Sequence, residues 1–154
     1  MSPLARTLRP SKLRHTKHNG FAVELKPGRE TAGKESMSTT VALVVGAGEG
    51  LRFGGEVPKQ YRRLAGHAIL RRSLMAFLDH PEVTAVQAVI HPNHQDLYQD
   101  AVRGLSLPYP VHGGATRQES VALGLESLAD NPPARVLVHD AARPLVDHGV
   151  ISRV

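Results

Sequence analysis

The stretch from residue 41 to residue 61, VALVVGAGEGLRFGGEVPKQY, constrains the fold of this chain more than any other. Its first six residues, VALVVG (41–46), form a continuous apolar run rich in β-branched side chains, which is typical of a strand buried on both faces. The run ends in a glycine-rich loop, and Pro58, Lys59 and Gln60 follow a few residues later. The fold must therefore hold a buried strand whose carboxyl end opens into that loop.

Helix and strand patterns alternate along the rest of the chain. The helix at 116–129 should pack on the sheet through Val121, Leu125 and Leu128, which are spaced along one face. The run ARVLVHD is interpreted as another buried strand, and the last residues, DHGVISRV, as the start of a helix. Strand alternating with helix predicts a parallel, three-layer α/β sheet. The predicted elements after the first strand are helices at 68–80, 93–104 and 116–129 and strands at 84–92, near 109–112 and at 134–140.

Composition and charge exclude several classes of protein. The chain has no cysteine, which excludes disulfides, a thiolate nucleophile and cysteine-ligated zinc. The formal net charge of +5 belongs to residues 1–36, and residues 37–154 are neutral overall. A neutral body with few aromatic residues argues against nucleic-acid binding. No apolar run approaches the ~18 residues of a membrane span.

Residues 1–40 contain several Pro and Gly residues and show no sustained period, so we predict a disordered, basic N-terminal extension. Met37 lies just before the first strand, and we interpret it as the functional start. The alternative is an organelle transit peptide, because the first 23 residues are basic and contain no acidic side chain. The first interpretation indicates the cytoplasm of a bacterium, and the second indicates a plastid.

The glycine-rich loop fits neither common nucleotide motif. Its glycines do not follow the Gly-x-Gly-x-x-Gly spacing, and Lys59 is followed by Gln60 rather than by the Ser or Thr of a Walker A loop. Glycines still allow backbone N–H groups to face an anion, and Arg52 and Lys59 add positive charge. The residues leave two alternatives open: a phosphate-binding loop, or a flexible surface loop with solvated cations.

A second glycine segment, GGATRQES (113–120), also follows a predicted strand. Its glycines precede a helix whose free N–H groups suit an oxyanion or a base edge. The alternative is an ordinary turn in which Thr116 caps the helix and Glu119 completes a capping box. Ser120 does not lie in a Gly-x-Ser-x-Gly elbow, so a hydrolase triad has no support.

The third segment, VLVHDAARPLV, ends a predicted strand with Asp140. Asp140 is the best candidate ligand for Mg²⁺, since that ion often takes one or two carboxylates together with substrate phosphates. The alternative is a turn aspartate that pairs with Arg143. His139 is interpreted as a packed strand residue, and the other histidines as loop residues. All three segments follow strands, so we expect 46–59, 113–120 and 139–144 to converge at the carboxyl edge of the sheet.

Taken together and in this order, GAGEGLRFGGEVPKQY, GGATRQES and VLVHDAARP resemble the 2-C-methyl-D-erythritol 4-phosphate cytidylyltransferase family over residues 41–154. The resemblance implies a Rossmann-like three-layer sandwich with a mostly parallel sheet, of the nucleotide-diphospho-sugar transferase type, truncated here. In that family the first segment wraps the triphosphate of CTP, and the second recognises cytosine and ribose. The third supplies the carboxylate on the magnesium side.

Residue by residue, the resemblance implies that Arg52 and Lys59 stabilise the transition state and that Asp140 is a ligand of Mg²⁺. The implied reaction is attack by a phosphate oxygen of methylerythritol phosphate on the α-phosphorus of CTP, with release of pyrophosphate. Because the acceptor phosphate is already an anion, positioning and charge neutralisation are expected to carry the chemistry. The other nucleotide-binding positions that the family implies are Ala47, Gly48, Gly50, Gly114, Ser120, Ala141 and Arg143.

The sequence departs from the family pattern in three places. The loop begins with Gly46, where members commonly have alanine, and Ala115 replaces an Asp that some members carry. The chain also stops at Val154, before the expected acceptor-binding residues and the arm through which members form homodimers. The expected partners are therefore small-molecule substrates, CTP and a polyol phosphate. The alternatives are a ribitol- or other polyol-phosphate cytidylyltransferase and an inactive CTP-binding fragment.

Overall fold

The computed structural model describes residues 39–48 and 57–154. Its main sheet has four strands, and every pair of neighbours in it is parallel. The strand order is β5-β4-β1-β6, which confirms the predicted mostly parallel sheet. The strands are β1 (Thr40–Gly46), β4 (Ala85–Ile90), β5 (Val111–His112) and β6 (Arg135–Asp140).

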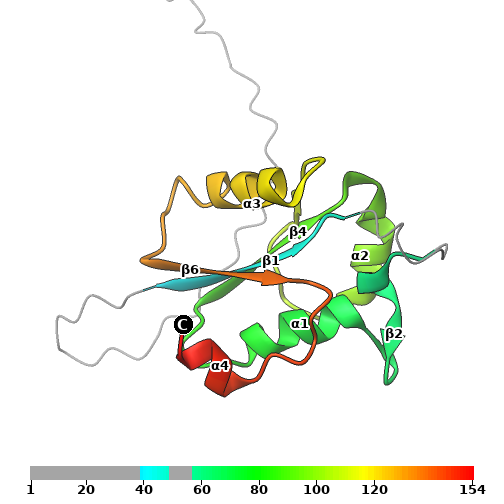
Figure 1. The fold of residues 1–154 in the computed structure, drawn as a ribbon, viewed down its shortest axis with the longest axis horizontal. Helices are drawn as coiled ribbons and strands as arrows, with labels where there is room; N and C mark the ends of the chain where they lie inside the picture. The colour runs from blue at the N-terminus through cyan, green and yellow to red at the C-terminus, as the bar shows by residue number, and fades with distance from the viewer. Residues whose placement is uncertain (1–38, 49–56) are drawn as a thin grey trace, which may run out of the picture. The chain divides into compact units, whose positions relative to one another are not determined.

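Helices cover both faces of this sheet and make a three-layer α/β sandwich, as predicted (Figure 1). Helix α3 (Arg117–Glu126) lies on one face, and α1 (Ile69–Leu78), α2 (Gln95–Ala101) and α4 (His148–Ser152) lie on the other. Within the described ranges, no helix is long and apolar enough to span a membrane. The sequence patterns did not predict four short elements: η2 (Lys59–Tyr61), η3 (Pro92–His94) and the hairpin strands β2 (Arg63–Leu64) and β3 (His67–Ala68).

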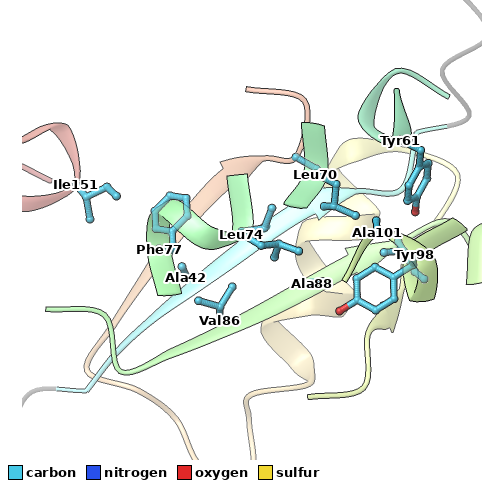
Figure 2. Close-up of a cluster of buried hydrophobic side chains, with 13 residues drawn as sticks. Ala42, Tyr61, Leu70, Leu74, Phe77, Val86, Ala88, Tyr98, Ala101 and Ile151 are labelled. Carbon is cyan, nitrogen blue, oxygen red and sulfur yellow. The ribbon is translucent and has the colours of Figure 1, made fainter. Parts of the chain in front are cut away.

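Strand β1 is buried on both faces, as its continuous apolar sequence predicted. Alternate side chains of a strand point to opposite faces. Ala42 and Val44 join the larger core cluster beneath α1, part of which Figure 2 shows. Leu43 and Val45 join the smaller cluster on the opposite face of the sheet. From Val41 to Val45 no residue is more than 8% exposed.

Helix α3 packs only partly through the predicted face: Val121 packs against the smaller core cluster, but Leu125 does not. Its buried residues are Ser120 and Gly124, whereas Leu125 is 43% exposed. A Cβ atom added to Gly124 would lie 2.7 Å from Leu43 Cδ1 and 2.9 Å from Val89 Cγ2. The absence of a side chain therefore brings the helix close to the sheet, and a count of apolar residues cannot detect such a contact.

Strand β6 was expected to be buried, and this expectation is wrong. None of its residues is classed as fully buried, and Val138 is 42% exposed. In the described part of the chain β6 pairs with β1 alone, so it is an edge strand of the sheet. An apolar run cannot distinguish an edge strand from a central one, because both need one covered face.

The N-terminal boundary of the folded part lies slightly earlier than predicted. Thr40, placed with the extension on sequence grounds, begins β1 and is only 4% exposed. The Thr84 backbone N–H donates to the Thr40 carbonyl oxygen at 2.8 Å, which fixes the start of the strand. The rest of the predicted extension, residues 1–38, lies outside the described residues.

Two buried tyrosines should make the free energy of unfolding depend on pH in the alkaline range. The side chains of Tyr61 and Tyr98 belong to the larger core cluster (Figure 2), and their hydroxyls have no hydrogen-bond partner within the described ranges. Burial raises the pKa of Tyr98 from its ordinary 10.0 to about 12. Burial, and secondarily the neighbouring Tyr98, raises the pKa of Tyr61 as well. The folded state therefore keeps both protons at a pH where the unfolded state loses them.

The free energy of unfolding should thus be unaffected by these groups below pH 10 and should fall as the pH rises above 10, by up to ~1 kcal/mol per pH unit for each tyrosine. Changing Tyr61 and Tyr98 together to Phe should remove this part of the loss and leave neutral-pH stability nearly unchanged, because neither hydroxyl has a described partner. Urea unfolding from about pH 8 to about pH 11 measures both effects. An equal alkaline loss in the double variant would contradict the assignment.

Candidate functional site

The strand order reverses at β1, and this reversal locates the candidate site. From β1 the chain builds the sheet outward through β4 and β5, and then returns to place β6 on the other side of β1. In open α/β sheets, ligands bind beyond the carboxyl ends of the strands at such a reversal. The crevice is therefore expected between the segments that follow β1 and β6.

These two segments contact each other closely. A Cβ atom added to Gly46 would lie 2.8 Å from Ala141 Cβ. The Ala141 N–H donates to the Val45 carbonyl oxygen at 2.8 Å, and the buried Ser73 hydroxyl on α1 donates to the Ala141 carbonyl oxygen at 2.9 Å. A side chain at position 46 would therefore crowd Ala141, and glycine lets the two segments approach each other closely.

Gln60 ties the Lys59 segment to the loop after β1. Its side-chain amide donates to the carbonyl oxygens of Gly46, at 2.8 Å, and Gly48, at 3.0 Å. Gln60 is only 5% exposed, whereas Lys59 is exposed at the start of η2. The residue next to the lysine therefore fixes where the lysine backbone lies relative to the glycine loop.

The segment after β5 packs against the same loop. The Gly113 N–H donates to the Ile90 carbonyl oxygen at 2.8 Å, and a Cβ atom on Gly113 would collide with Ala47 Cβ and lie 2.6 Å from Ser120 Oγ. Ser120 is 1% exposed, and its hydroxyl donates to the Thr116 carbonyl oxygen at 2.8 Å. Ser120 is thus placed beneath Gly113, where it supports the glycine segment.

The start of α3 forms the capping box that the sequence allowed. Thr116 Oγ1 accepts from the Glu119 N–H at 3.1 Å, and the Glu119 carboxylate accepts from the Thr116 N–H at 3.2 Å. A Cβ atom on Gly114 would lie 2.6 Å from Glu119 Cβ, so this glycine also lies in a crowded place. The capping box and an anion site are compatible, because a cap uses only some of the free N–H groups of the first turn.

Asp140, at the end of β6, is held by two arginines. Arg117 Nε and Nη2 each lie 3.0 Å from Asp140 Oδ1, and Arg143 Nε lies 3.0 Å from Oδ2. The Asp140 side chain is 31% exposed, and those of Arg117 and Arg143 are 64% and 76% exposed. The pairing with Arg143, which the alternative turn-aspartate interpretation expected, is present. Arg117 connects the segment after β5 to Asp140 at the end of β6.

The residues at this edge fit a cation that is shared with a polyphosphate. No group of three His, Asp or Glu side chains in residues 39–48 and 57–154 could hold a metal ion on its own. Asp140 supplies one partly exposed carboxylate at the carboxyl edge. Mg²⁺ characteristically takes one or two carboxylates and completes its coordination with water and substrate phosphates.

The histidines occupy different settings. The His139 ring packs against Phe77 with ring centroids 5.0 Å apart, and its Nε2–H donates to the Arg143 carbonyl oxygen at 2.9 Å. His139 is therefore a packed strand residue, as predicted. The loop interpretation is confirmed for His80, which follows α1 but is buried, at 3% exposed; it is wrong for His67, His112 and His148, which lie in β3, β5 and α4. His80 Nδ1 accepts from the Glu82 N–H, and Nε2–H donates to the His148 carbonyl oxygen, which joins the end of α1 to α4.

Most of the residues predicted for the site lie at the carboxyl edge of the sheet, although their roles toward a nucleotide remain predictions. Gly50 and Arg52 lie outside the described residues. The predicted site residues that belong to the contacting segments at this edge are Ala47, Gly48, Lys59, Gly114, Ser120, Asp140, Ala141 and Arg143.

Two contributors to the site were not predicted from the sequence. Gln60 was noticed only as the residue that breaks a Walker motif, yet its amide holds the loop. Arg117 was given no role, yet its guanidinium group binds Asp140. The signal for Arg117 was its place in the first turn of a helix that starts at the same sheet edge as Asp140.

The crowding at Gly113 gives a prediction for stability. Gly113→Ala should lower the free energy of unfolding by about 2 kcal/mol, because the new methyl group must displace Ala47 or Ser120. Adding Ala47→Gly should restore part of the loss, since it removes one of the two colliding groups. Urea unfolding of the single and double variants measures both. A fully stable single variant would show that the two segments do not pack this closely.

Comparison with known proteins agrees with this geometry. The family model of 2-C-methyl-D-erythritol 4-phosphate cytidylyltransferase matches residues 40–154. A bifunctional enzyme IspD/IspF of Paramagnetospirillum magneticum is 60% identical over 118 residues, which are 77% of this chain and 31% of that protein. A protein of the same name from Rhodospirillum rubrum is 56% identical over 119 residues, again 77% of this chain and 31% of that protein. The chain thus spans about a third of the length of these curated relatives.

Solved structures show the same fold. The 4-diphosphocytidyl-2C-methyl-D-erythritol synthase of Anaerococcus prevotii superposes with a TM-score of 0.63 at 25% identity, over 76% of this chain and 49% of that one. The 2-C-methyl-D-erythritol 4-phosphate cytidylyltransferase of Francisella tularensis gives a TM-score of 0.58 at 30% identity, over 75% of this chain and 49% of that one. These likenesses agree with the three-layer fold.

Proposed function

The chain belongs to the 2-C-methyl-D-erythritol 4-phosphate cytidylyltransferase family, and from this premise we propose that its carboxyl-edge site binds CTP and transfers CMP to 2-C-methyl-D-erythritol 4-phosphate. The reaction releases pyrophosphate and serves isoprenoid precursor synthesis. We assign it to a domain formed by residues 40–154. The proposed setting is the cytoplasm of a bacterium, because the relatives named above come from bacteria.

One observation carries this proposal: three segments far apart in the sequence meet where the strand order reverses. Gly46 lies against Ala141, and Gly113 lies against the neighbouring Ala47. Arg117 joins the second segment to Asp140 in the third. Close backbone approach together with clustered guanidinium groups is suited to a polyphosphate.

The proposed chemistry needs charge neutralisation more than proton transfer. A phosphate oxygen of the acceptor forms a bond to the α-phosphorus of CTP, and the bond from that phosphorus to the bridging oxygen breaks, so the electron pair leaves on pyrophosphate. Arg52 and Lys59 would neutralise the charge that develops on the α-phosphate oxygens. The backbone of Ala47 and Gly48 would face the triphosphate, and Gly114 and Ala141 would lie beside the base and the ribose.

Asp140 is the proposed protein ligand of Mg²⁺, with Arg143 beside it. A bound divalent cation would supply further neutralisation of the triphosphate charge. The Asp140 carboxylate would then hold the nucleotide at the end of β6 indirectly, by way of the cation bound to the triphosphate. Ser73 keeps the adjacent Ala141 backbone in place through a buried hydrogen bond.

The proposal is tested by incubating the full 154-residue chain with CTP, Mg²⁺ and an acceptor, and by measuring pyrophosphate release. We expect release with methylerythritol phosphate and much less with ribitol phosphate. Replacing CTP by UTP should also lower release, because the site is assigned to cytosine. A calorimetric titration of CTP is run in parallel on the same preparation.

The outcomes separate the candidate functions. Faster release with ribitol phosphate would assign the chain to polyol-phosphate cytidylyl transfer instead. CTP binding without release for any acceptor would leave only a nucleotide-binding role. Absence of both CTP binding and release would contradict the proposed function as a whole.

A further inference from the structure

We propose that Arg117 is a positioning residue that occupies the Asp140 carboxylate in the free protein and gives it up when a nucleoside triphosphate binds. In this way Arg117 keeps free divalent cations away from Asp140 until the nucleotide is present. The inference rests on the proposed function, because it takes Asp140 as the metal-side carboxylate. It assigns to Arg117 a role that the sequence patterns did not indicate.

The geometry of the contact supports this role. Two nitrogens of Arg117, Nε and Nη2, both lie 3.0 Å from the single oxygen Oδ1 of Asp140. The other oxygen, Oδ2, lies 3.0 Å from Arg143 Nε. Each carboxylate oxygen that a metal ion would use therefore already has a charged hydrogen-bond donor. A cation arriving alone would have to displace at least one guanidinium group.

The two arginines differ in how they reach the carboxylate. Arg143 lies three residues beyond Asp140 in the same turn, and its N–H donates to the Asp140 carbonyl oxygen at 3.1 Å. Arg117 comes from the first turn of α3, which the capping box of Thr116 and Glu119 holds in place. Arg117 therefore reaches Asp140 from a separate segment, the one that follows β5.

The charges at this place favour a nucleotide-dependent exchange. Two guanidinium groups and one carboxylate leave a net positive charge, which repels a free divalent cation. A triphosphate brings several negative charges into the same crevice and offers the guanidinium groups better partners, since arginine pairs with phosphate oxygens in a bidentate manner. Both arginine side chains are more than 60% exposed, so they can change partner without unpacking the core.

The test uses the full chain, with Mn²⁺ alone as the probe for an oxygen-ligand metal site. Electron paramagnetic resonance measures free Mn²⁺ during titration of the wild type, Arg117→Gln and Arg117→Lys. Calorimetry then measures binding of CTP with a chelator present. Arg103→Gln is the matched control, because Arg103 is an exposed arginine that also pairs with an aspartate, Asp100, at 2.9 Å.

We expect Arg117→Gln to bind Mn²⁺ about fivefold more tightly than the wild type and to bind metal-free CTP about fivefold more weakly. Arg117→Lys should be intermediate, because a lysine keeps the charge and loses the paired N–H groups. Arg103→Gln should change neither affinity. Tighter binding of Mn²⁺ together with weaker binding of CTP would not arise if Arg117 only supported folding, because a folding defect would weaken both affinities.

Mn²⁺ binding by Arg117→Gln that is equal to or weaker than that of the wild type, including no detectable binding by either, would overturn the inference. This measurement needs neither CTP nor an acceptor. Absent CTP binding or pyrophosphate release would therefore count against the proposed function alone. The order of Mn²⁺ affinities among the variants would still decide the role of Arg117. Adding Asp140→Asn to Arg117→Gln should abolish the gained Mn²⁺ affinity, and a gain that survives would also overturn it.

Discussion

Replacing Lys59 by alanine is expected to lower kcat for pyrophosphate release by at least about a hundredfold, with little change in stability. The lysine is exposed on η2, so its side chain contributes little to the core. The neighbouring Gln60 would still hold the segment against the glycine loop, because its hydrogen bonds to Gly46 and Gly48 do not involve the lysine side chain. The loss should therefore appear in kcat measured by single-turnover kinetics, and not in the urea midpoint.

Two further variants make this prediction specific. Lys59→Arg keeps the charge and should recover part of the rate, whereas Arg63→Ala removes an exposed positive charge from the adjacent β2 strand and should leave the rate unchanged. An unchanged rate in Lys59→Ala would refute the assignment of Lys59 to the transition state. An equal loss in Arg63→Ala would indicate a general effect of net charge.

Changing Asp140 to asparagine is expected to have the second large effect, a shift of the Mg²⁺ requirement for turnover to at least about tenfold higher concentrations. Asparagine keeps the size of the side chain and removes its charge, so the remaining amide is a weak metal ligand. The ion pairs lost with Arg117 and Arg143 are largely exposed, and such pairs contribute less than about 1 kcal/mol each to stability. The measurement is the initial rate as a function of Mg²⁺ concentration at saturating CTP.

Asp100→Asn is the matched control, because Asp100 is an exposed aspartate that pairs with an arginine in the helix α2 region. Its Mg²⁺ dependence should be that of the wild type. If Asp140→Asn also keeps the wild-type dependence, Asp140 is only a turn residue held by its arginines, and the metal assignment is wrong.

The fold could be predicted from the sequence where only one arrangement, such as burial on both faces, explains an apolar run. The run at 41–46 has no polar face, and it forms the strand that is covered on both sides. The prediction failed where packing depends on something other than apolar side chains. Helix α3 approaches the sheet through Gly124, and Leu125 points away from the core. The exposure of β6 depends on which strands pair, and its own residues do not encode this.

The candidate site could be predicted at the level of segments but not of contacts. Three glycine- or acid-bearing segments after strands were enough to indicate one shared edge. The bridge from Arg117 to Asp140 spans 23 positions, and no spacing rule connects a helix residue to a strand end at that separation. The support from Gln60 was missed for the same reason, because it depends on where the loop carbonyls point.

The central claim is that the segments after β1, β5 and β6 form one nucleotide site, and amide NMR shifts during a titration with CTP and Mg²⁺ test it most directly. We predict that the amides of Gly46, Gly113 and Ala141 shift together with one common affinity, and that an equal concentration of UTP moves them less. Amides at the opposite edge of the sheet, such as those of Thr84 and Arg135, should stay in place. Shifts at that opposite edge with none at the three segments would contradict the claim.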